Sequence, residues 1–233
     1  MSITENVNRI LSEMEKAAVA AGRNPKEICL CAATKMNNAA AIQEAIAAGV
    51  TCCGENRVQE LTQKLSENAY DGAQIHFIGH LQTNKVKQVV GKVSLIHSID
   101  SLRLLEAVNK EALRQGIRQD ILLEINIGNE ESKSGFTPEE LPQVLSAITG
   151  FPGIFVRGLM AIPPICQNTG DNNKFFQKMY QLSVDISEKK YDNVCSTVLS
   201  MGMSADYREA IACGSTMVRI GTDIFGARNY PNK

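Results

Sequence analysis

The sequence predicts an α/β protein, a single (β/α)8 barrel of the TIM type with an extra helix at its N-terminus. Three observations lead to this prediction. Short apolar segments recur eight times along the chain, and a helical pattern fills each gap between them. No G-x-G-x-x-G turn, which marks many open dinucleotide-binding sheets, follows the first segment. Eight alternations of strand and helix favour a closed parallel barrel, with an open doubly wound sheet as the alternative.

The first element is an amphipathic helix expected over residues 3–22. Its polar face carries Glu5, Glu13 and Glu15, and it lacks the basic start, apolar centre and cleavage site of an export signal. We therefore expect a cytoplasmic protein in which this helix packs on the barrel. One domain is expected to cover residues 1–233.

The first half of the predicted barrel contains four strands and the helices between them. Asn38 opens a helix that closes at Gly49, and Ser101 opens another that closes at Gly116. Apolar runs bounded by turn residues place the strands at Ile28–Lys35, Thr51–Asn56, Ile75–Leu81 and Ser94–Asp100.

The second half repeats the pattern. Thr137 as N-cap and Pro138 at the first helical position begin the helix after the fifth strand. The loosest segment, Pro163–Lys174, is interpreted as a loop on the barrel rim. The remaining strands are expected at Asp120–Gly128, Ile154–Ile162, Ser196–Gly202 and Thr216–Gly226.

Composition excludes several classes of function. Hydrophobic residues make up 44% and charged residues 21%, as in a soluble globular protein. The formal charge of -1 provides no field for nucleic acid or an anionic membrane, and no apolar run approaches the roughly 20 residues of a membrane span. We expect neither disulfides nor a metal centre, because no export signal is present and the cysteines lack zinc-finger spacing. The seven cysteines are Cys29, Cys31, Cys52, Cys53, Cys166, Cys195 and Cys213.

Functional residues of such barrels project from the carboxyl ends of the strands. Strand alternation places Lys35 on the same side as Cys29, Cys31 and Ala33, facing the barrel interior. Partial desolvation there lowers the pKa of a lysine and frees its amine to attack an aldehyde, whereas a rim lysine simply extends into water. The other polar strand ends are Glu55 with Asn56, His80, Asp100, Asn126, Ser200, and Thr222 with Asp223.

The last two strands supply a possible phosphate site. Ser200 ends the seventh strand, and Arg219 is followed by Gly221 and Thr222 at the end of the eighth. Barrels frequently hold a phosphate in the loops after these two strands, because glycines allow backbone N–H groups to approach it closely. Together with Lys35, these residues indicate a phosphorylated carbonyl compound bound as an imine.

Other polar residues favour structural interpretations. His97 is interpreted as a core histidine, and His76 could face outward, so neither receives a role. Glu55 and Asp223 could form an acid/base pair, but such carboxylates are as often partners of arginines or helix N-termini.

Six sequence motifs stand out along the chain. They are AATK ending at Lys35, GENRVQE at Gly54–Glu60, HFIGHLQTNKVK at His76–Lys87, SKSGF at Ser132–Phe136, GLMAIPP at Gly158–Pro164, and the long block LSMGMSADYREAIACGSTMVRIGTDIFGAR at Leu199–Arg228. Together they resemble one known family, the pyridoxal 5′-phosphate (PLP) homeostasis proteins, which share the alanine racemase N-terminal barrel. The resemblance implies that Lys35 forms a Schiff base with PLP. It further implies that Arg219 faces the pyridine nitrogen, while Ser200, Gly221 and Thr222 hold the phosphate and Asn56, His80 and Met201 line the cofactor.

The implied function is intracellular storage and delivery of PLP, with effects on amino-acid balance and with apo PLP-dependent enzymes as possible recipients. An arginine at the pyridine nitrogen keeps its own proton, so the ring would be a weak electron sink and little catalysis is expected. A racemase-like enzyme is the alternative, which requires a second acid/base group such as Tyr207 or Tyr230. A Schiff-base aldolase is a third possibility. A monomer is expected.

Overall fold

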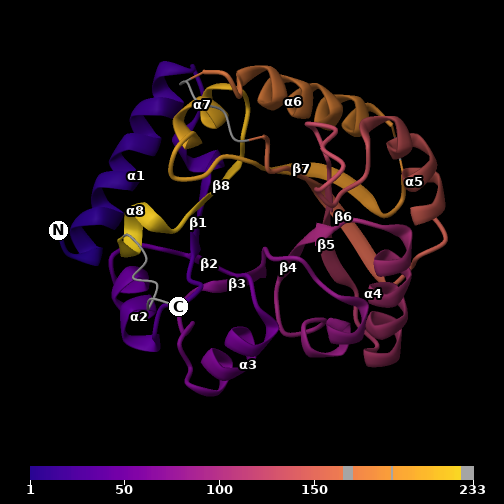
Figure 1. Cartoon of the computed structure of the whole chain (residues 1–233), viewed down its shortest axis with the longest axis horizontal. Helices are drawn as coiled ribbons and strands as arrows, with labels where there is room; N and C mark the ends of the chain where they lie inside the picture. Colours follow the sequence, from indigo (N-terminus) through magenta and orange to yellow (C-terminus); the bar gives the residue numbers. More distant parts are fainter. Residues whose placement is uncertain (165–169, 190, 227–233) are drawn as a thin grey trace.

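The computed structural model describes residues 1–164, 170–189 and 191–226, and it shows a closed barrel (Figure 1). Each strand pairs in parallel with the strands before and after it in the sequence, and β8 closes the ring on β1. This arrangement confirms the predicted fold class. The strands are β1 Cys29–Ala33, β2 Cys52–Glu55, β3 Gln74–Phe77, β4 Leu95–Ile99, β5 Gln119–Glu124, β6 Ile154–Met160, β7 Val194–Ser200 and β8 Met217–Ile220.

Helices surround the barrel, and the predicted caps are present. The Asn38 side chain accepts a hydrogen bond from the Ala41 N–H, and Ser101 accepts one from Leu104. Gly116 ends its helix in the left-handed conformation, with φ of 67°. The α-helices are α1 Ile3–Ala20, α2 Ala39–Ala47, α3 Val58–Ser66, α4 Leu102–Gln115, α5 Leu141–Ile148, α6 Asn173–Glu188, α7 Tyr207–Ala212 and α8 Thr222–Phe225, and the 3-10 helices are η1 Pro25–Glu27, η2 Thr83–Gln88 and η3 Pro138–Glu140.

The extra helix α1 packs against α2, α7 and α8, so the first described helix contacts the last one (Figure 1). The Asn6 side chain donates to the Ile224 carbonyl, and Arg9 donates to the Asp223 carbonyl. Glu13 accepts a hydrogen bond of 2.5 Å from the Tyr207 hydroxyl. The Tyr207 side chain is therefore fully buried against α1 and is not available as the second acid/base group that a racemase-like enzyme requires. Tyr230 lies outside the described residues.

The two sides of the sheet differ as strand alternation predicts. Cys31 and Ala33 form an interior cluster with Cys52, whereas Leu30 and Ala32 belong to the larger core between strands and helices. Small residues therefore fill the narrow interior beside β1, and larger ones anchor the helices. None of the described helices combines the length and apolar character that a membrane span requires.

All eight predicted strands end earlier in the structure, by one to six residues, and local structure explains the difference for the eighth and the fifth. The eighth stops at Ile220, because Gly221 leaves the extended conformation and Thr222 begins α8. The fifth stops at Glu124, because the Asn126 side chain turns the chain by bonding to the Glu130 and Lys133 carbonyls. The predicted rim loop Pro163–Lys174 lies partly outside the described residues.

Candidate functional site

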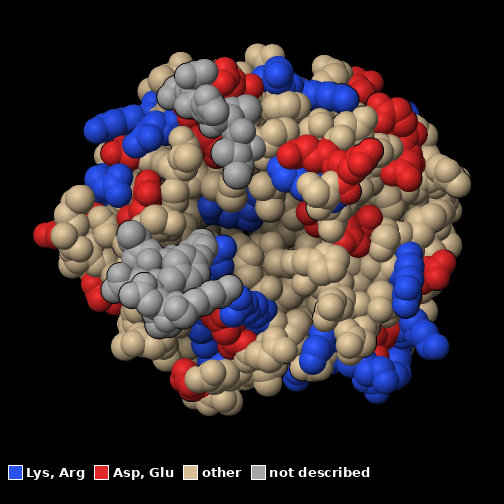
Figure 2. Space-filling model, in the orientation of Figure 1, with Lys and Arg blue, Asp and Glu red and all other residues tan. Residues whose placement is uncertain are grey.

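The carboxyl ends of the strands surround a hollow on the face seen in Figure 2. Basic side chains lie in and around this hollow, and acidic side chains gather along one side of it. Lys35 and Asn56 follow β1 and β2, while Ser200 and Gly221 end or follow β7 and β8. Because β7, β8, β1 and β2 are consecutive neighbours in the ring, these residues share one sector of this hollow, which we call the mouth of the barrel. Gly221 lies so close to β1 that a Cβ on it would be 3.2 Å from the Ala33 carbonyl oxygen.

The backbone on the N-terminal side of Lys35 is anchored by a buried ionic network. The Lys64 ammonium donates to the Thr34 carbonyl at 2.8 Å and to the Glu55 carboxylate at 2.5 Å. The Thr34 hydroxyl donates to the same carboxylate at 2.6 Å. Glu55 is therefore a partner of Lys64, not of Arg57, Arg219 or a helix N-terminus, and the network fixes the chain one residue before Lys35.

The backbone on the other side of Lys35 is held as well. Met36 adopts a left-handed conformation, with φ of 63°, which is uncommon for a residue with a side chain. Its N–H donates to the Glu60 carboxylate at 2.6 Å, and Lys64 donates to the same carboxylate at 3.1 Å. Partial burial raises the pKa of Glu60, but these two hydrogen bonds outweigh that effect and lower it. Lys35 is thus presented on a strained turn between two fixed residues.

Ser200 and Arg219 form the opposite part of this sector. Arg219 is 5% exposed; it donates to the Ser200 hydroxyl at 2.5 Å and to the Ala161 carbonyl at 3.0 Å. Burial lowers the pKa of Arg219, yet a guanidinium keeps its proton in proteins. The barrel therefore contains a fixed positive charge directly beneath the end of β7.

A chain of polar contacts runs from Ser200 down the barrel interior. The Ser200 hydroxyl lies 3.1 Å from His97 Nδ1, and His97 Nε2 lies 3.0 Å from His76 Nδ1. Burial, with the nearby His76 and Arg219, lowers the pKa of His97 far enough to keep it neutral. His97 is the satisfied core histidine that the sequence predicts, whereas His76 faces inward rather than outward.

Below these histidines lie two thiols. Cys52 Sγ is 3.3 Å from His76 Nδ1, and Cys52 also contacts Cys31. The hydrogen bond from Cys52 outweighs burial and, with His76 and Arg219, lowers the pKa of Cys31 to about 6. Contacts with Cys29 and Cys31 raise the pKa of Cys52.

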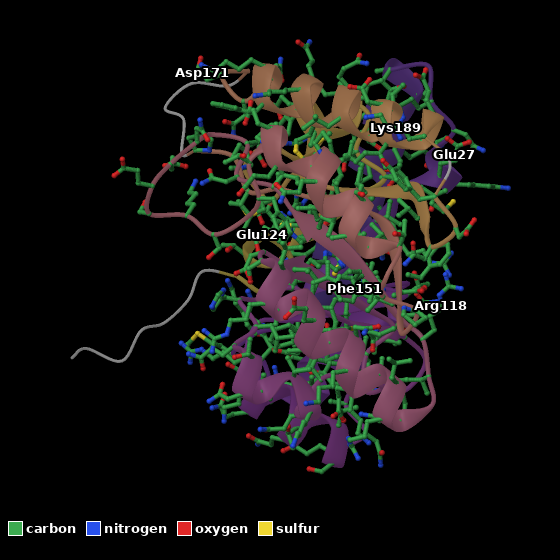
Figure 3. The ribbon with its side chains drawn as sticks, turned by 90° about the vertical axis from the view of Figure 1, so that its right-hand side faces the viewer. Glu27, Arg118, Glu124, Phe151, Asp171 and Lys189 are labelled. Carbon is green, nitrogen blue, oxygen red and sulfur yellow. The ribbon has the colours of Figure 1, made fainter. Side chains whose placement is uncertain are left out.

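Glu124 at the end of β5 is a mouth residue that sequence reasoning missed. Figure 3 shows it at the end of the barrel opposite Arg118 and Phe151. Burial and the nearby Asp100 raise its pKa to about 7, although Arg219 and His80 oppose this. The sequence predicts an extended run as far as Gly128, with Asn126 as the polar residue near its end. Only the position of the loop after β5 reveals Glu124 as the strand end.

The other predicted residues are placed as follows. Asn56 lies beside Gly79, and its Oδ1 is buried with no hydrogen-bond partner among the described residues. His80 is largely exposed and lies 3.1 Å from an Asp100 carboxylate oxygen. Thr222 is exposed at the start of α8, whose first N–H groups have no intrahelical partner. Met201 packs in the core outside the barrel, so its side chain does not join the others.

Comparisons with known proteins show the family and agree with the fold. The family model described as alanine racemase, N-terminal domain, matches residues 5–229. A protein of Aquifex aeolicus named pyridoxal phosphate homeostasis protein is 41% identical over 230 residues, which cover 99% of this chain and 100% of the relative. The chain belongs to the pyridoxal phosphate homeostasis protein family.

Two solved structures are similar to this chain in sequence and in fold. A protein of unknown function from Bifidobacterium adolescentis is 36% identical and superposes with a TM-score of 0.87, covering 96% of this chain and 94% of that one. PipY of Synechococcus elongatus, determined with PLP bound, is 32% identical with a TM-score of 0.79, covering 92% of this chain and 100% of PipY. The match to the family model, over residues 5–229, includes Lys35, Ser200 and Arg219.

Proposed function

We propose that this protein reversibly binds PLP through the Lys35 amine and acts in intracellular PLP homeostasis by holding and delivering the cofactor. The observation that carries the proposal is the position of Lys35. The Lys64, Glu55 and Glu60 network fixes its backbone next to the strand ends that present Ser200, Arg219 and Gly221. The names of the relatives and the PLP-bound PipY structure support the same cofactor.

Three features of the mouth fit a phosphorylated pyridine aldehyde. Gly221 approaches β1 closely and leaves backbone N–H groups at the start of α8 accessible to a phosphate. The Ser200 hydroxyl is held by Arg219 and His97 at the end of β7, where it can complete the cradle. The buried Asn56 Oδ1 accepts no hydrogen bond within the part of the chain that the structure describes, and the ring hydroxyl of PLP can supply one.

The residues around this site favour holding over turnover. PLP supplies an electron-withdrawing ring when it is bound, and catalysis depends on how far the protein strengthens that property. Arg219 is buried, charged and fixed by Ser200 and Ala161, so it cannot protonate a pyridine nitrogen beside it. This arrangement supports delivery of PLP to apo-enzymes rather than carbanion chemistry.

One observation favours a second candidate, a weak racemase-like activity. Glu124, with a pKa of about 7, lies at the mouth within the field of Arg219 and is suited to exchange protons near neutrality. Such an activity would use Glu124 in place of a tyrosine, since Tyr207 is buried against α1.

Reduction with borohydride tests cofactor binding. Purified protein incubated with PLP is expected to be yellow, and borohydride is expected to bleach it and leave a phosphopyridoxyl mass on the peptide that contains Lys35. The Lys35→Ala variant should gain no such mass, whereas Lys133→Ala is a control for another partly exposed lysine. An unmodified Lys35 peptide in the wild-type protein would refute the proposal.

Isotope exchange separates holding from turnover. Each amino acid is incubated with the loaded protein in deuterated water, and the α-proton is followed by NMR. The carrier function predicts no sustained exchange, together with recovery of activity when an apo PLP-dependent enzyme is added. Multiple turnovers that disappear in Glu124→Gln would instead support the racemase-like candidate.

A further inference from the structure

A second set of potential ligands lies inside the barrel, away from Lys35. Cys31, Cys52 and His76 are all buried, and one ligand atom from each lies within 4.8 Å of the other two. The Cys52 Sγ to His76 Nδ1 distance is 3.3 Å. Cys29 lies two residues before Cys31 on β1, and its thiol contacts Cys52. Three neighbouring strands therefore direct three thiols and an imidazole toward one point.

We propose that Cys31, Cys52 and His76 form a zinc-binding site, with the Cys29 thiol beside the fourth coordination position. Thiolate sulfur and imidazole nitrogen are the donors that zinc prefers, at about 2.3 Å and 2.0–2.1 Å respectively. Tetrahedral bonds of these lengths separate the ligand atoms by about 3.5–3.8 Å. The observed cluster already lies near this spacing, so small side-chain rotations are enough to complete the site.

An ion can reach this cluster without passing the Lys35 mouth. A cavity of about 760 Å³ opens at the amino ends of β1–β4, and Cys29 and Cys52 both line it. The cavity lies at the end of the barrel where Arg118 and Phe151 precede their strands, opposite Glu124 (Figure 3). Metal and carbonyl ligands would thus enter from opposite ends.

His97 is the first group outside the proposed ligands. It contacts the same His76 Nδ1 atom that would coordinate the ion, and its other ring nitrogen contacts Ser200. Ion binding at His76 Nδ1 would end the His76–His97 hydrogen bond. Loading is therefore expected to alter the environment of His97, which gives a readout independent of any enzymatic activity.

Cobalt titration tests the proposal directly. Reduced, chelator-treated protein without PLP is titrated with Co²⁺, and we expect visible bands of tetrahedral cobalt and thiolate-to-cobalt charge transfer that saturate at one ion per chain. Zn²⁺ should displace the cobalt. Cys31→Ala and Cys52→Ala should each weaken binding by at least about tenfold, because loss of an outer-shell partner alone costs about 10- to 100-fold.

Two control variants keep the test specific. Cys53→Ala changes a buried thiol on the outer side of β2, and Cys195→Ala changes an exposed one; both should bind cobalt like the wild-type protein. Thermal unfolding of the apo forms verifies that each variant is folded. The proposal is overturned if wild-type protein gives no thiolate–cobalt bands. It is equally overturned if folded Cys31→Ala and Cys52→Ala proteins bind as tightly as the controls.

Discussion

Replacement of Lys64 by methionine tests the network that positions Lys35. The Lys64 side chain is 7% exposed and that of Glu55 is 0% exposed, so the variant leaves a buried carboxylate without its charged partner, although the Thr34 hydroxyl still donates to it. Removing one partner of a buried ion pair costs about 3–5 kcal/mol of unfolding free energy. For a chain of this size that corresponds to a fall in Tm of about 6–20 °C.

Urea unfolding followed by circular dichroism measures this effect. Lys87→Met is the matched control, because the same change at an exposed lysine should stay within about 0.5 kcal/mol. The double variant Lys64→Met/Glu55→Gln removes both charges and should recover much of the loss. A loss below about 1 kcal/mol for Lys64→Met, or a double variant less stable than the single one, would refute the idea that this pair is electrostatically coupled.

Three further predictions concern other parts of the molecule. Glu124 has a folded-state pKa of about 7 against 4.5 ordinarily, so the stability of the wild-type protein should fall by about 1–3 kcal/mol as pH rises between these values. Glu124→Gln should abolish this fall, which is measured by denaturation at pH 5 and pH 8. Equal pH dependence in both proteins would contradict the prediction. Gly79→Ala places a Cβ 2.1 Å from the Asn56 carbonyl oxygen, so it should lower the free energy of unfolding by about 1–3 kcal/mol and weaken PLP binding in an absorbance titration. The control Gly22→Ala has open space around its Cβ and shows the effect of backbone conformation alone. Tyr207→Phe removes the hydrogen bond that does most to lower the pKa of Glu13, so the variant should be less stable than the wild-type protein at pH 7. This loss of stability should shrink as acid protonates Glu13. A loss that does not depend on pH would assign the effect to packing.

The sequence was sufficient to predict the ring of strands and the orientation of β1. The helix caps Asn38 and Ser101 and the inward orientation of Cys31 and Ala33 follow from local sequence patterns, and both are confirmed. The interior network was not predictable in this way. His76 and His97 lie 21 residues apart, and their contact depends on the register between β3 and β4.

Lys64 shows a second limit of sequence reasoning. In the sequence, Lys64 looks like any solvent-exposed lysine of an amphipathic helix. The neighbouring residues in the sequence do not show that the Thr34 carbonyl and the Glu55 carboxylate, which follow or end β1 and β2, lie within reach of its ammonium group. The proposed zinc ligands were missed for a related reason. Finger motifs carry their ligands at short spacings along the chain, whereas Cys31, Cys52 and His76 are brought together by three adjacent strands.

The contacts between α1 and α8 have a consequence for the folding of this protein during its synthesis on the ribosome. Asn6 and Arg9 can form their hydrogen bonds only after the Ile224 and Asp223 carbonyls have been synthesised, more than two hundred residues later. Lys35 likewise emerges long before Arg219 and Gly221, which complete its sector of the mouth. A nascent chain therefore exposes its reactive lysine without the residues proposed to retain PLP, and tight capture of the cofactor is expected only after translation has ended.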